Sequence, residues 1–162
     1  MAGTHKLGNG TPVRIMQIID TENCSQVFIR NLLEKHEIES ADGDLEPSLF
    51  RNKFNNQLVT VQYLENAQLI SIMTLTKTPG EFSEDEIINL AEWFNRRYKY
   101  RVSTRVIRNN LFLRVEYLLP VMAVPHGFSV NSFVVEVLSA CNFTFDLASR
   151  FKEFVSRSSV SR

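Results

Sequence analysis

The stretch FSEDEIINLAEWFNRR, residues 82–97, constrains the fold most, because it predicts an amphipathic helix with both ends defined. Ser83 occupies an N-cap position, and Glu86 three residues later completes a capping box. Acids fill the first turn and two arginines fill the last, which matches the helix dipole at both ends. The apolar stripe expected to face the core consists of Ile87, Leu90, Ala91 and Phe94.

The segments on either side of this helix alternate with a period of two, which predicts antiparallel strands. Before the helix, strands are expected at about 57–64 and 68–77, with a shorter strand near 49–54. After the helix a hairpin is expected, with a two-residue turn at Asn109 and Asn110 because Asn tolerates positive φ. That turn pairs residues whose numbers sum to 219, so Arg105 would face Arg114 across the hairpin.

Two further helical regions complete the predicted order. The first is expected from Asp20 or Thr21, either of which can cap it, to about Glu37, and a polar acidic loop follows at 39–47. The last begins at Ser129 and is apolar on more than one face, with poor helix formers at 142–144 that allow a break there. Residues 12–19 fit a short strand or a helical lead-in equally well.

These elements predict an α+β fold: an antiparallel sheet of about five strands in the order α-β-β-β-α-β-β-α, with the helices packed on the sheet. The chain has 162 residues, of which 44% are hydrophobic and 22% charged, as expected for one globular domain. We expect flexible tails at 1–11 and 156–162 around a single domain at 12–155. No apolar run approaches the length of a membrane span and no secretory signal is evident, which predicts a cytoplasmic protein.

Few residues in the sequence form a chemical motif. The two cysteines and three histidines are scattered, so we predict no metal site and no cofactor; they are Cys24, Cys141, His5, His36 and His126. A catalytic site would need a nucleophile with its base or paired carboxylates, and the available acids are not spaced for that work. These acids are Glu65, Glu116, Glu136 and Asp146. The interpretation is therefore a non-enzyme without catalytic residues.

Charge is segregated although the net charge is zero. Residues 34–46 carry six acids, whereas seven of the eighteen Lys and Arg residues fall between positions 96 and 114. The segment NRRYKYRVSTRVIRNN could grip nucleic acid through Arg101, Arg105 and Arg114. Strand alternation explains these arginines first, and it places Tyr100 and Tyr117 on the core side, away from any bound base. A nucleic-acid partner is therefore disfavoured.

Two segments resemble the YbjN domain family, also called bacterial sensory transduction regulators. These are LAEWFNRRYKYRVSTRVIRNNLFLRVEYLLP, which contains WFNR at 93–96, and GFSVNSFVVEVLSACNFTFDLASRF, which opens with GFS at 127–129. The likeness covers about residues 20–155, and the chain departs from the family pattern in its Phe-rich final helix. It implies a fold like the class I type III secretion chaperones, often dimeric, and a regulatory role through protein contacts, without established catalytic residues.

The functional hypothesis is a regulatory or chaperone-like protein-interaction module with a protein partner. A type III secretion chaperone is the nearest alternative, which zero net charge disfavours, since such chaperones are usually acidic. A two-fold homodimer is expected, because one sheet cannot cover every apolar side of the final helix. In the alternative, the last helix folds back and hides both sides. The candidate interaction residues are Arg101, Arg105, Arg114, Phe133, Val137 and Phe151.

Overall fold

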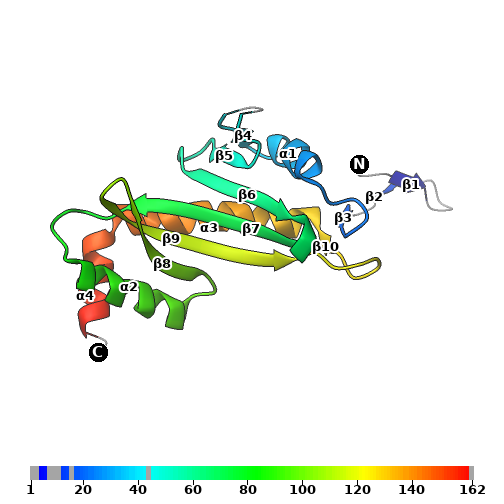
Figure 1. Ribbon diagram of the computed structural model, residues 1–162. Helices are drawn as coiled ribbons and strands as arrows, with labels where there is room; N and C mark the ends of the chain where they lie inside the picture. Colours follow the sequence, from blue (N-terminus) through cyan, green and yellow to red (C-terminus); the bar gives the residue numbers. More distant parts are fainter. Residues whose placement is uncertain (1–3, 7–11, 15–16, 43–44, 161–162) are drawn as a thin grey trace.

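The computed structural model describes residues 4–6, 12–14, 17–42 and 45–160. A six-stranded antiparallel sheet dominates it, in the order β4-β5-β6-β7-β9-β8 (Figure 1). Its strands are β4 (Ile38–Ser40), β5 (Leu49–Asn52), β6 (Leu58–Leu64), β7 (Leu69–Lys77), β8 (Arg101–Ile107) and β9 (Asn110–Pro120). The helices are α1 (Gln26–Glu34), α2 (Glu84–Arg97), α3 (Val130–Ser149) and α4 (Phe151–Val160), with one 3-10 turn, η1 (Glu65–Ala67).

Two small strand pairs lie beside this sheet. β3 (Ile18–Ile19) pairs with β10 (Phe128–Ser129), and β1 (Thr4–Lys6) pairs with β2 (Pro12–Arg14). Residues 12–14 and 18–19 are therefore strands rather than a helical lead-in. Part of the predicted N-terminal tail, Thr4–Lys6, forms β1, while 1–3 and 7–11 lie outside the described residues.

The α+β class and the antiparallel sheet are confirmed, and the expected count of about five strands is corrected to six in the described part of the chain. Strands β5, β6 and β7 lie within two residues of their predicted bounds. The unexpected strand is β4, which adds a fourth strand between the first two predicted helices. It spans only three residues, and its second half overlaps the segment in which the sequence predicts the acidic loop.

The hairpin of β8 and β9 turns one residue earlier than predicted. Arg108 and Asn109 form the turn, both with positive φ, at 49° and 66°. The numbers of paired residues therefore sum to 217. Arg105 lies opposite Phe112 and Arg114 lies opposite Ser103, so the predicted like-charge pair does not form. The sum of paired residue numbers is two lower than predicted. Because side chains alternate between the faces with a period of two, each face still carries the residues predicted for it.

Helix α2 has the two ends that its sequence predicts. Ser83 Oγ accepts a hydrogen bond from the Glu86 backbone N–H at 3.2 Å, and Glu86 Oε1 accepts one from the Ser83 N–H at 3.0 Å. The four residues of the predicted apolar stripe are the buried residues of this helix. The capping box is therefore confirmed.

Replacing Ser83 by Ala is expected to lower the free energy of unfolding by about 0.5–2 kcal/mol, because a first-turn N–H then loses its acceptor. Chemical denaturation measures this change. Ser156→Ala, an exposed serine within α4, is the matched control and should leave the midpoint in place. An unchanged midpoint and m-value in the Ser83 variant would remove Ser83 from this role.

The start of α1 is corrected. Its N-cap is Ser25, whose Oγ accepts from the Phe28 N–H at 3.0 Å, and not Asp20 or Thr21. Asp20 instead closes a preceding turn, where its Oδ1 accepts from the backbone N–H groups of Glu22 and Asn23. The helix ends at Glu34, three residues before the predicted end, since the chain then turns into β4.

The final helical region begins at Ser129 as predicted, with Ser129 Oγ accepting from the Ser132 N–H. The helix continues through 142–144, where the sequence allows a break, because Thr144 is buried and hydrogen-bonds Thr74 of β7. The break falls at Arg150, after which α4 packs against α2. Residues 156–160, expected in a tail, belong to α4 with Ser158 buried, and 161–162 lie outside the described residues.

Candidate interaction face

The sheet has two unlike faces. On one face, alternate residues of the strands are buried against helices, and Figure 1 shows α3 crossing behind β7 and β9. The buried members of this core face are Ile38, Phe50, Asn52, Val59, Val61, Ile70, Ile72, Thr74, Val102, Leu113 and Val115. The residues between them point to the other side, which we call the open face. None of the open-face residues of β5 to β9 is buried, so no part of the described chain covers that side.

Ten of the 21 open-face residues of β5 to β9 are apolar. They are Leu49, Leu58, Leu64, Leu69, Met73, Leu75, Ile107, Phe112, Leu118 and Pro120. Cross-strand pairing makes Leu64, Leu69 and Pro120 one apolar row, whereas Met73 lies between Thr60 of β6 and Glu116 of β9. Leu58, Leu64 and Leu118 are 41%, 36% and 42% exposed. Contiguous exposed apolar surface of this kind marks interaction sites on soluble proteins.

The charged residues of the open face are mostly basic: Arg51, Lys77, Arg101, Arg105 and Arg114, against two acids, Glu116 of β9 and Glu39 of β4, which lies opposite Arg51. Arg114 and Glu116 form an ion pair at 2.6 Å, in which the Glu116 side chain is only 14% exposed. The other four basic residues form no ion pair with the described part of the chain. Five basic residues against two acids give this face a charge of +3.

The predicted interaction residues separate into two groups. Arg101 and Arg105 are exposed on the open face, and Arg114 lies half-buried beside them. Phe133, Val137 and Phe151 are no more than 4% exposed, which corrects their assignment to a surface. They are covered because α3 packs on the core face and α4 folds back against α2.

Sequence reasoning missed the apolar residues of the open face, although a signal was present. Strands β6 and β7 carry apolar residues at positions of both parities, whereas a strand with one solvated face alternates apolar and polar residues. Leu58, Leu64 and Met73 break that alternation. The second side of these strands therefore lacks the regular polar residues of a solvated face.

Side-chain amides cover the strand edges beside this surface. Asn95 of α2 binds both backbone groups of Val102 on β8, donating to its C=O at 2.8 Å and accepting from its N–H at 2.6 Å. Gln26 of α1 does the same on β6, where it donates to the Val61 C=O and accepts from the Tyr63 N–H, both at 2.8 Å. Each amide stands in for a neighbouring strand and satisfies backbone groups that the sheet leaves unpaired.

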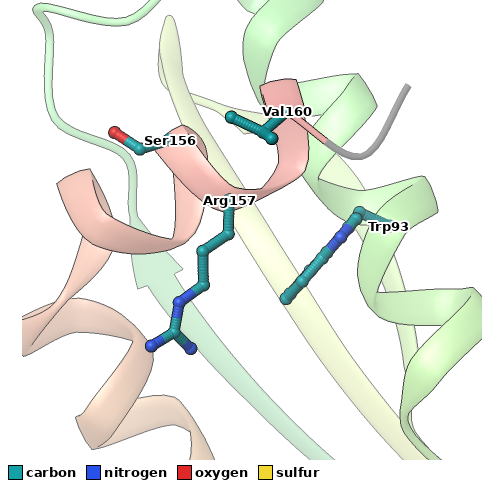
Figure 2. Close-up of a pocket in the computed structure, with 4 residues that line it drawn as sticks. All are labelled: Trp93, Ser156, Arg157 and Val160. Atoms are coloured by element: carbon teal, nitrogen blue, oxygen red, sulfur yellow. The ribbon is translucent and has the colours of Figure 1, made fainter.

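A second candidate is a shallow depression of about 400 Å³ between α2 and α4, lined by Trp93, Ser156, Arg157 and Val160 (Figure 2). Figure 2 shows Trp93 and Arg157 reaching from the two helices into the same space. Arg97 lies 4.6 Å from the centroid of the Trp93 ring, and Glu153 binds Arg157 at 2.6 Å. This lining contains no carboxylate, imidazole or thiol, so it holds no general base that could activate the Ser156 hydroxyl.

The two thiols are poorly suited to nucleophilic chemistry. Burial raises the pKa of Cys141 to about 12, with the nearby Asn52 amide opposing that shift. Burial, and then the negative charge of Asp20, raise the pKa of Cys24 to about 11. Both therefore stay protonated at neutral pH, whereas the thiolate is the reactive form.

Three of the four carboxylates considered for catalysis have cationic partners. Glu116 binds Arg114, Glu136 binds Lys99 at 2.5 Å, and Asp146 binds Arg150 at 3.3 Å. Three or more His, Cys, Asp or Glu side chains do not converge into a possible metal site within the described ranges. Across the same ranges, no helix combines the length and apolarity needed to cross a lipid bilayer.

No protein-family model matches the chain, and neither a curated protein nor a solved structure matches it. The open face is therefore interpreted from its own residues.

Proposed function

We propose that the chain is a non-catalytic protein-interaction module that binds its partner through the open face. One observation carries the proposal: an uncovered sheet surface across β5 to β9 presents contiguous apolar residues with basic residues among them. Burial of such surface against a partner is the main favourable term in protein association. The regulatory role implied by the resemblance to the YbjN family agrees with a module that works by contact.

Two neighbouring proposals use the same kind of surface. A chaperone-like role would place a segment of a client protein on the open face. A homodimer would place a second copy there, but the argument from the final helix no longer supports it, since Phe133, Val137 and Phe151 are covered within the chain. Dimerisation therefore has to be supported by the open face itself.

Site-specific photo-crosslinking in extracts of the source organism tests the proposal. A photoreactive amino acid at Leu118 should give a discrete protein adduct, while the same group at Ser156, on α4, should not. Met73→Glu places a second carboxylate beside Glu116 at the centre of the open face and should abolish the Leu118 adduct. Ile88→Glu is the matched control, a partly exposed residue of α2 away from the sheet, and should leave the adduct unchanged.

Thermal unfolding of each variant establishes that the chain is folded before its adducts are compared. Adducts of equal strength from Leu118 and Ser156 would contradict binding through the open face. An adduct that persists in folded Met73→Glu would do so as well.

A further inference from the structure

We infer that the occupant of the open face is an acidic amphipathic helix of a partner protein, and not a second copy of this chain. The inference rests on the proposed function, since it identifies the chemistry of the partner for that surface. Its basis is the distribution of charge and apolar area over the face.

The open face is polar at one end and apolar at the other. Strand pairing places Arg105, Phe112 and Lys77 in one row across β8, β9 and β7. The row at the far end contains Leu64, Leu69 and Pro120. Arg101 lies nearer the middle on the edge strand β8, so β8 forms a basic margin along one side of the apolar area.

This distribution opposes two-fold pairing of the face with itself. In a two-fold pair the same patch meets its copy, so a charge of +3 would meet a charge of +3. If the axis runs along the strands, the row with Arg105 and Lys77 faces the same row of the copy. If the axis runs across the strands, that basic row faces the apolar row with Leu69 and desolvates its charges without a partner. An axis along the strands between β8 and β9 would set Arg101 against Glu116 of the copy, but Glu116 already binds Arg114, so basic charge remains in excess.

Nucleic acid fits the charge of the face but not its remaining chemistry. Binding of single strands combines phosphate contacts with stacking of bases on aromatic rings. Phe112 is the one aromatic residue of the open face, and the other apolar residues there are aliphatic or proline. Burial against apolar side chains is favourable for Leu64, Leu118 and Met73, and a phosphate backbone does not provide such side chains.

The dimensions of the face suit a helix. Strands lie about 4.8 Å apart, so a helix about 10 Å wide covers two to three of them. A helix along β7 and β9 would set its apolar stripe on Met73, Leu75 and Leu118. Carboxylates on the side toward β8 would then lie beside Arg101 and Arg105, which have no acidic partner in the described part of the chain.

A peptide selection tests the inference although the partner is unidentified. A displayed library of random peptides is selected on the full-length protein, and the strongest binder is synthesised for fluorescence anisotropy. Enriched peptides should carry apolar residues at helical spacing with Glu or Asp on one side. The double variant Arg101→Glu/Arg105→Glu should weaken binding of that peptide by at least about tenfold, through lost charge complementarity.

Arg96→Glu, a charge reversal of an exposed arginine on α2, is the control and should leave binding unchanged. The inference is overturned if no peptide is enriched, if the enriched peptides lack acids, or if the double variant binds as well as the wild type. If Met73→Glu abolishes binding while the double variant does not, the open face remains a binding surface and only the acidic partner is wrong. If neither change affects binding, the proposed function fails too.

The two competing occupants have their own measurements. Light scattering over a concentration series should give the mass of one chain, 18.7 kDa. A dimer that Met73→Glu dissociates would make the second copy the occupant and overturn the inference. An oligouridine RNA of about 20 nucleotides that displaces the peptide at moderate salt would do the same in favour of nucleic acid.

Discussion

Replacement of Phe94 by Ala is expected to lower the free energy of unfolding by about 3–5 kcal/mol. The ring is fully buried, and its centroid lies 5.2 Å from those of Trp93 and Phe154, 5.3 Å from that of Phe143 and 5.4 Å from that of Tyr98. These rings belong to α2, α3 and α4 and the segment after α2, so one side chain joins three helices. Its removal leaves a cavity that several elements would have to move to fill.

Equilibrium denaturation measures the effect, with Ile88→Ala as the control. Ile88 lies in the same helix but is 37% exposed, so its truncation should cost far less. Equal losses for the two variants would show that the cluster around Phe94 is not the main contact between α2 and the final helices.

Replacement of Gly127 by Ala is expected to separate β10 from β3 and to destabilise the fold by about 1–3 kcal/mol. A Cβ at position 127 would lie 2.3 Å from the Ile19 backbone oxygen and 2.6 Å from Ile18 Cγ2. The first of these atoms belongs to the backbone of β3, which pairs with Phe128 and Ser129. Either the pairing or the position of the α3 N-terminus must therefore shift.

Hydrogen exchange at the amides of β3 and β10, together with the denaturation midpoint, measures this effect. Gly80→Ala provides the matched control, because a Cβ there would meet no atom within 4 Å. Native protection of the β3 amides in the Gly127 variant would mean that the backbone accommodates the methyl group without separation.

The sequence predicted those elements whose signals lie within a single helix or a single strand. The capping box and apolar stripe of α2 depend on residues within one helix, and the alternation of β6 and β7 depends on residues within one strand. The hairpin register was wrong because Asn109-Asn110 is a strong turn signal, yet Arg108 takes the first left-handed position at a φ of 49°. Arg has no intrinsic preference for a positive φ, so the packing of the strands determines which residues form the turn.

Tertiary packing explains why half of the candidate interaction residues were misplaced. The sequence shows that the last helical region is apolar on several sides, but not which sides other elements cover. The break at Arg150 lets Phe151 and Phe154 of α4 pack against α2, and that packing is a long-range property. The three arginines were placed on the right face because parity along a strand is local.

The amides of Gln26 and Asn95 bear on how this chain can assemble. A row of unpaired strand groups is a template that accepts another strand, and each added strand offers a new row, so growth has no natural end. Gln26 and Asn95 bind some of these backbone groups through their side-chain amides, and a side-chain amide offers no new strand edge to a further chain. A sheet face, in contrast, offers no new binding surface once one partner covers it. The two amides thus favour complexes of fixed stoichiometry over filaments, which lets the chain present a broad apolar sheet while limiting the routes to amyloid-like polymerisation.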